Sequence, residues 1–128
     1  MRQLGVIAFA DGCQVGAAWL RTFTQAESAL ARFVEASTPE LAIAVLPNSI
    51  GVGIGSRLME ELTKEADLRL IPQIVLSVRD NNPAVRLYQR HGFVSVGRVT
   101  NRVGSDSLKM IRNRTAAVLP ARNSGTEE

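Results

Sequence analysis

The most informative part of this sequence is Glu40-Leu-Ala-Ile-Ala-Val-Leu-Pro47, followed shortly by Ile50-Gly-Val-Gly-Ile-Gly55. The first segment is almost continuously apolar, as expected of a strand that is buried on both faces. The alternate glycines of the second leave backbone N–H groups bare and let a ligand approach closely. Apolar residues that recur every four positions predict a helix from Val52 to about Arg69, whose N-terminus adds partial positive charge. These features together predict an anion site that suits a phosphate or a pyrophosphate.

The rest of the chain supplies further strands and helices around this unit. The additional segments that we predict are strands at 4–10 and 13–23 joined by Asp11-Gly12, a helix at 25–35, a strand at 74–78, a helix at 82–91 and strands at 93–100 and 107–112. The two strands within residues 40–78 should be parallel and joined by a right-handed crossover. This order predicts an α+β fold of three layers, with a mixed sheet of about six strands and helices on both faces.

The length of 128 residues fits one domain, which we place at residues 1–112, and residues 113–128 have the character of a flexible tail. The sequence shows neither an apolar run of about 20 residues nor a signal-peptide pattern, so we expect no membrane association. The single cysteine, Cys13, fits a reducing cytoplasm.

The charge and the histidine content exclude several classes of function. A net charge of +3 with few aromatic residues argues against nucleic acid as a partner, although it suits a small anionic ligand. His91 is the only histidine, which argues against a zinc site and against a histidine-rich catalytic centre. We therefore expect no metal.

The glycine segment alone fits no common nucleotide motif. A dinucleotide fold needs Gly-x-Gly-x-x-Gly directly after the strand, but residues 47–49 intervene and Ser56 takes the place of the last glycine. A P-loop ends in Gly-Lys-Ser/Thr, whereas this segment ends in Gly55-Ser56-Arg57. A nucleotide-binding regulatory domain stays open as the weakest of the alternatives.

A second motif separates these alternatives. Its parts, in chain order, are Leu76-Ser-Val78, Asn82-Pro-Ala84, Leu87-Tyr88 and Gly92-Phe93. Together with the glycine segment, this motif resembles the GNAT superfamily of acyl-CoA-dependent N-acyltransferases, and the resemblance runs from about Leu4 to Ile111. It implies acetyl-CoA as co-substrate and transfer of the acetyl group to a primary amine of a small molecule or a protein, by direct attack in a ternary complex. The alternative is a GNAT-like module that binds acyl-CoA or a protein partner without turnover.

The resemblance also implies a set of site residues. Those that would bind the cofactor are Ile43, Ala44, Val45, Ile50, Gly51, Val52, Gly53, Ile54, Gly55, Ser56, Asn82 and Tyr88. The strand 43–45 would splay from the strand 74–78 and pair with the pantetheine arm as an added strand does. For Asn82, two interpretations are about equally good. It could contact the amide groups of that arm, or it could be a helix N-cap.

Two residues are candidates for catalysis. The resemblance implies that Tyr88 protonates the departing thiolate, against the alternative that it is a core aromatic residue. Glu40, which we expect at the mouth of the cofactor strand, could take a proton from the attacking amine, directly or through water. Its alternative is an exposed glutamate.

The chain departs from the family pattern in two places. Ile50 stands where members carry Arg or Gln beside the pyrophosphate, and a charge-assisted contact of that kind contributes roughly 1.5–3 kcal/mol. Members also begin with another strand and two helices before the hairpin, so the N-terminus looks short. The strand at 4–10 would then lie at a sheet edge, where a second chain could pair to form a homodimer.

Overall fold

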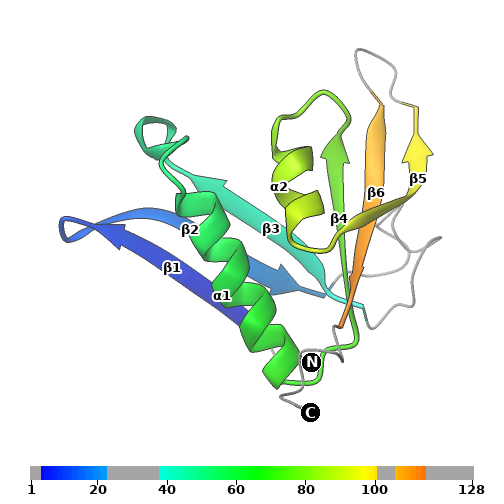
Figure 1. The fold of residues 1–128 in the computed structure, drawn as a ribbon, viewed down its shortest axis with the longest axis horizontal. Coiled ribbons are helices and arrows are strands. Elements are labelled where there is room, and N and C mark those ends of the chain that lie inside the picture. The colour runs from blue at the N-terminus through cyan, green and yellow to red at the C-terminus, as the bar shows by residue number, and fades with distance from the viewer. Residues whose placement is uncertain (1–3, 23–37, 101–105, 115–128) are drawn as a thin grey trace, which may run out of the picture.

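A computed structural model of the chain describes residues 4–22, 38–100 and 106–114. Its strands are β1 (Leu4–Ala10), β2 (Cys13–Arg21), β3 (Glu40–Val45), β4 (Gln73–Arg79), β5 (Val94–Val99) and β6 (Ser107–Asn113). Its helices are α1 (Ile54–Leu68) and α2 (Ala84–Arg90), with a short 3-10 turn at Pro47–Ser49. The strands form one six-stranded sheet in the order β1-β2-β3-β4-β6-β5 (Figure 1).

The sheet is mixed, as the sequence predicted, because β3 and β4 run parallel while the other neighbouring pairs are antiparallel. The predicted hairpin joins β1 to β2. Its turn needs left-handed backbone at both central residues, and Asp11 and Gly12 supply it with φ angles of 53° and 79°. β1 forms one edge of the sheet, and a homodimer formed through this edge stays a prediction.

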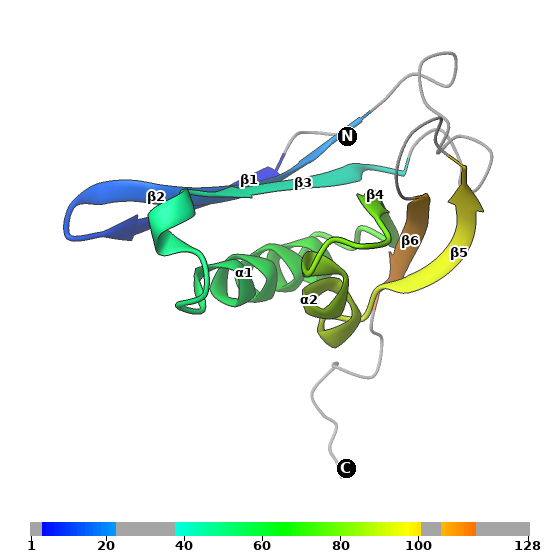
Figure 2. The same ribbon diagram turned by 90° about the horizontal axis from the view of Figure 1, so that it is seen from above.

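Both described helices pack on the same face of the sheet (Figure 2). The helix predicted at 25–35 lies outside the described residues, so helical cover of the other face stays a prediction.

β6 continues to Asn113, and the N–H group of Arg114 still donates to the carbonyl oxygen of Pro72 at 2.8 Å. The flexible tail stays a prediction too, since the structure describes nothing beyond residue 114.

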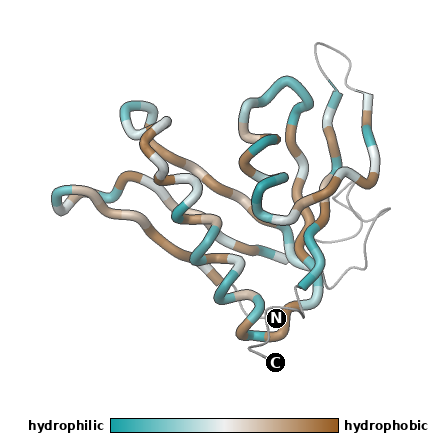
Figure 3. The backbone as a smooth tube through the Cα atoms, in the orientation of Figure 1, coloured by the Kyte–Doolittle hydropathy of each residue, from teal (hydrophilic) through white to brown (hydrophobic). Residues whose placement is uncertain are grey.

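The core lies between α1 and the sheet. Leu58, Leu62 and Ala66 recur on one face of α1 and are almost completely buried, as the four-residue spacing predicted. The apolar stretches of the strands run beneath this helix (Figure 3). Gly16 of β2 permits the close packing, because a Cβ atom there would lie 3.1 Å from the Cδ1 atom of Leu58.

β3 and β4 pair only where they begin. Their one register pair is Glu40 with Val75, and the N–H group of Val75 donates to the carbonyl oxygen of Pro39 at 3.0 Å. Beyond this pair the strands diverge, and the N-terminal end of α2 lies near the wide end of the opening (Figure 1). The splayed pair of strands that the resemblance implied is therefore present.

Candidate active site

The opening between β3 and β4 exposes backbone groups of β3. Ala44 is opposite Ala17 of β2, and just beyond β3 the N–H group of Leu46 donates to the carbonyl oxygen of Val15 at 2.8 Å. Along an antiparallel pair, every second residue directs its N–H and C=O groups toward the neighbouring strand. Ala44 lies two residues before Leu46, so it also directs its backbone groups toward β2. Ile43 and Val45 direct theirs to the other side, where β4 has moved away. These groups are available to an extended ligand.

The glycine turn provides a second set of free backbone donors. Gly51 and Gly53 have φ angles of 90° and 86°, in the left-handed region that glycine adopts without strain. The first amide bonded within α1 is that of Arg57, which donates to the carbonyl oxygen of Gly53 at 3.1 Å. Within the described part of the chain, the N–H groups of residues 51–56 meet no acceptor, and no acidic side chain lies in the first turn of α1. The turn therefore offers a cluster of donors at the positive end of a helix dipole.

A cleft of about 630 Å³ joins the opening to the glycine turn. Its lining residues are Ile43, Val45, Ile50, Gly51, Gly53, Gly55, Ser56, Asn82, Pro83, Ala84, Leu87, Tyr88 and Arg90. Most of the residues that the sequence nominated for the cofactor are thus brought together around one cavity, though their roles stay predictions. Ala44, Val52, Ile54 and Glu40 do not line it.

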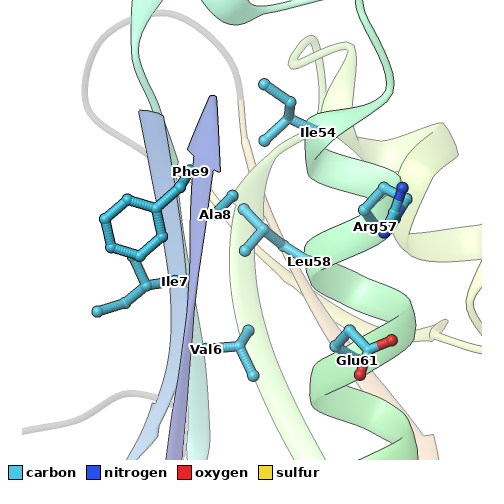
Figure 4. A pocket seen from close by; sticks show the side chains of 8 residues that line it. All are labelled: Val6, Ile7, Ala8, Phe9, Ile54, Arg57, Leu58 and Glu61. Atoms are coloured by element: carbon cyan, nitrogen blue, oxygen red, sulfur yellow. The ribbon is translucent and has the colours of Figure 1, made fainter. Parts of the chain in front are cut away.

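The side chain of Ile54 points to a different cavity. With Leu58 it faces Val6 and Ala8 of β1 across a pocket of about 290 Å³, whose walls also include Arg57 and Glu61 (Figure 4). Only the backbone of Ile54 therefore belongs to the free donors of the glycine turn.

Tyr88 enters the cleft from the core. Its ring is 8% exposed and meets the ring of Phe93 edge-on, with the centroids 6.0 Å apart. Burial raises the pKa of the Tyr88 phenol above its usual value, so the hydroxyl is protonated at neutral pH. Among the described residues, no side chain makes a hydrogen bond to this hydroxyl. Tyr88 is thus a core aromatic residue that also lines the cleft, and its role as a proton donor stays a prediction.

Asn82 makes the hydrogen bond of a helix cap, and its contact to the cofactor stays a prediction. Its Oδ1 atom accepts a hydrogen bond of 2.8 Å from the N–H group of Ala84, as a helix cap does. The same residue lines the cleft, and its Nδ2 group is a donor that the cap bond does not use.

Glu40 does not lie where the sequence analysis placed it. The expected mouth of the strand is its far end, near Val45, whereas Glu40 lies at the closed end where β3 still pairs with β4. The Oε1 atom of Glu40 is 3.5 Å from the Nε atom of Arg21, and 18% of its side chain is exposed. The reason for the difference is the direction of the divergence, which the local sequence pattern does not encode. The assignment of Glu40 as a base stays a prediction without support from this position.

The sequence analysis did not nominate four of the lining residues, which are Pro83, Ala84, Leu87 and Arg90. Arg90 is the charged one of the four. Among the described residues around the cleft, it carries the only formal charge. Pro83, Leu87 and Arg90 are spaced i, i+4, i+7, which places them on one face of a helix. This spacing, read from the position of Asn82, could have identified Arg90 as a cation beside the predicted anion site.

Within the described residues, none of the helices has the length and apolar character needed to cross a bilayer. No group of three or more His, Cys, Asp or Glu side chains there is arranged to hold a metal ion.

Comparison with known proteins agrees with this geometry. A profile of the acetyltransferase (GNAT) domain matches residues 3–95. Among solved structures, a GNAT-family acetyltransferase from Streptococcus pneumoniae is 26% identical, with a TM-score of 0.73, over 88% of this chain and 67% of that one. The ribosomal-protein-alanine N-acetyltransferase from Brucella melitensis is also 26% identical, with a TM-score of 0.71, over 85% of this chain and 67% of that one.

A third structure has the same fold at lower identity. The GNAT-superfamily phosphinothricin acetyltransferase from Sinorhizobium meliloti, solved with acetyl-CoA, is 22% identical with a TM-score of 0.69, over 94% of this chain and 66% of that one. Among curated proteins, the comparison found no match.

Proposed function

Because this chain belongs to the GNAT acetyltransferase family, we propose that it transfers an acetyl group from acetyl-CoA to a primary amine. The observation that carries this proposal is the opening between β3 and β4, which ends at a glycine turn with free amide groups. A solved relative of the same fold was crystallised with acetyl-CoA. The acceptor is an amine of a small molecule or of a protein.

Each part of acetyl-CoA has a complementary group on the protein. The amide groups of the pantetheine arm pair with the backbone of Ile43 and Val45, in the way that an added strand pairs with a sheet edge. The pyrophosphate lies on the N–H groups of residues 51–56, at the N-terminus of α1. The guanidinium of Arg90 adds a positive charge on the same cleft and offsets part of the charge that Ile50 does not supply.

The chemistry proceeds by direct attack within a ternary complex. The nitrogen of the neutral amine forms a bond to the thioester carbonyl carbon, and the bond between that carbon and sulfur breaks. The departing thiolate takes the proton of the Tyr88 hydroxyl, which burial keeps protonated until charge develops on the sulfur. The amine's own proton reaches Glu40 only through water, because that carboxylate lies at the closed end of β3.

A binding module without turnover is the second candidate, and Ile50 is the observation that favours it. Its side chain is 68% exposed at the rim of the cleft, at the position where the family resemblance implies a charged or amide group. Weaker attraction of the pyrophosphate would lower cofactor affinity without changing the fold.

Release of free CoA thiol in the presence of a panel of amines tests the proposal. We expect release above the hydrolytic background with at least one class of primary amine, and loss of that signal when the amine is omitted. Acetyl-CoA binding without thiol release for any amine would favour the second candidate. Absence of acetyl-CoA binding would refute the proposed function and leave, of the second candidate, only a module that binds a protein partner.

A further inference from the structure

A single side-chain hydrogen bond joins the two helices at the wall of the cleft. The Oγ atom of Ser56, in the first turn of α1, lies 3.2 Å from the Nε2 atom of His91. His91 is the residue that directly follows α2, and its N–H group donates to the carbonyl oxygen of Tyr88 at 3.0 Å. The next residue, Gly92, turns the chain with a φ angle of 93°. The imidazole is therefore held by the end of one helix against the start of the other.

The direction of this hydrogen bond decides what Ser56 offers to a ligand. A serine hydroxyl has one proton to donate and can accept two hydrogen bonds. If the hydroxyl donates to the imidazole, it presents only lone pairs to an anion in the cleft. If Nε2–H donates to Oγ, the serine proton remains available to the anion. An anion on the glycine turn therefore selects the form of His91 that carries a proton on Nε2.

We propose that His91 is a positioning residue for the anion site: its Nε2–H group donates to Ser56, and the Ser56 hydroxyl in turn donates to a phosphate oxygen of the cofactor. This inference rests on the proposed function, because it takes the cofactor's pyrophosphate as the anion. His91 itself does not touch the cofactor.

The charges around His91 make this arrangement sensitive to pH. In the free protein, burial is the main cause that lowers the pKa of His91, and Arg90 and Arg112 act in the same direction, whereas Glu60 raises it. These groups come from α1, α2 and β6, the elements packed around the ring. A pyrophosphate bound beside Ser56 adds negative charge and raises this pKa. Binding then takes up protons, so the affinity is highest at low pH and falls as the pH rises through the pKa of the complex.

The test is calorimetric titration with 3′-dephospho-CoA between about pH 5.5 and 8. This probe is chosen because its diphosphate stays fully ionised in that range, whereas the 3′-phosphate of CoA, a phosphomonoester, titrates near pH 6. We expect His91→Ala to weaken binding roughly 3- to 10-fold at pH 7, the effect of one hydrogen bond. His91→Gln, which keeps an N–H donor but cannot titrate, should restore the affinity at pH 7 and give a flat pH profile.

Two controls separate positioning from a merely structural role. In a Ser56→Ala background, His91→Ala should cause a much smaller loss of affinity, because the hydrogen-bonded partner is gone and only the longer-range charge of the imidazole remains. Gln89→Ala, an exposed change on α2 away from the cleft, should leave binding unchanged. His91 is the only histidine of the chain, so its ring signals in an NMR titration report its pKa directly, and the pKa should rise when the probe is added.

The outcomes are distinct. Binding by the wild type with no effect of His91→Ala, or with a His91 pKa that does not rise, would overturn the inference and leave the proposed function intact. A wild-type protein that folds but binds no dephospho-CoA would overturn the inference and count against the proposed function as well.

Discussion

At the level of single residues, Tyr88 belongs both to the core and to the lining of the cleft. Its ring meets that of Phe93 edge-on, and among the described residues no side chain makes a hydrogen bond to its hydroxyl. The ring alone would satisfy the core, so the hydroxyl is the part of the side chain that a function must explain.

Tyr88→Phe should therefore lower kcat by about 10²-fold, the usual contribution of a general acid, with little change in KM. The aromatic ring remains, so the melting temperature should stay within a few degrees of the wild type. Steady-state kinetics with a reactive amine provide the measurement, and an unchanged kcat would remove Tyr88 from the mechanism. Because the pKa of the phenol is raised, ionisation of Tyr88 should not reduce the rate of the wild type below about pH 10.

Ile50 is the position where a substitution should improve the protein. Ile50→Arg places a guanidinium at the rim of the cleft and should lower the Kd for acetyl-CoA about 3- to 10-fold, an effect that salt weakens. Val52→Arg is the matched control, because Val52 is equally exposed, at 70%, but does not line the cleft. Equal effects of the two changes would show that net charge alone is responsible.

Removal of the positive charge of Arg90 should weaken cofactor binding. Arg90→Gln should raise the Kd for acetyl-CoA by about 3- to 10-fold, a limited effect because solvent screens the charge of an exposed side chain. Arg86→Gln removes a charge from the same helix at an exposed position outside the cleft and should have little effect. Isothermal titration of both variants with acetyl-CoA measures the two Kd values. Equal values would show that Arg90 has no special role in cofactor binding.

At the level of elements, the opening between β3 and β4 makes a prediction that needs no mutation. In the free protein, the amides of Ile43 and Val45 should exchange rapidly with solvent, while that of Ala44 should be protected by its pairing with β2. Acetyl-CoA should slow exchange at Ile43 and Val45 by about tenfold or more and leave Ala44 unchanged. Residue-resolved hydrogen exchange measures this, and uniform protection of all three amides would contradict the predicted strand phase.

The elements themselves could largely be predicted from the sequence. Both described helices follow apolar spacing and end signals, and the hairpin follows Asp11-Gly12. α1 begins at Ile54, later than the predicted Val52, because the left-handed backbone of Gly53 delays the first helical residue. Boundaries shift in this way because dihedral angles at a glycine depend on the neighbouring strand as well as on the sequence.

The candidate site could be predicted only in part. The glycine turn, Asn82 and Tyr88 are local signals, and the fold places them around one cleft. The position of Glu40 depends on which end of β3 separates from β4, and that is a property of sheet twist rather than of local pattern. Arg90 was missed because its significance comes from lining the same cleft as the glycine turn, which belongs to another part of the chain.

At the level of the whole molecule, two halves of the sheet meet at the opening. β1 to β3 form one half and β4 to β6 the other, with both described helices on the same face (Figure 2). Arg112 of β6 fastens the second half to α1 through two hydrogen bonds to Asp67, of 3.0 and 2.9 Å. These two hydrogen bonds connect the half of the sheet that contains β6 to the C-terminal turn of α1.

A thermal melt with acetyl-CoA, ATP or NAD tests whether this opening binds acyl-CoA. At about a hundredfold excess over its Kd, a ligand stabilises the folded state by roughly 2.7 kcal/mol, which should raise the melting temperature of a domain of this size by about 10 °C. We expect this rise with acetyl-CoA and no comparable rise with ATP or NAD. A cooperative melt whose midpoint acetyl-CoA leaves unchanged would contradict this expectation.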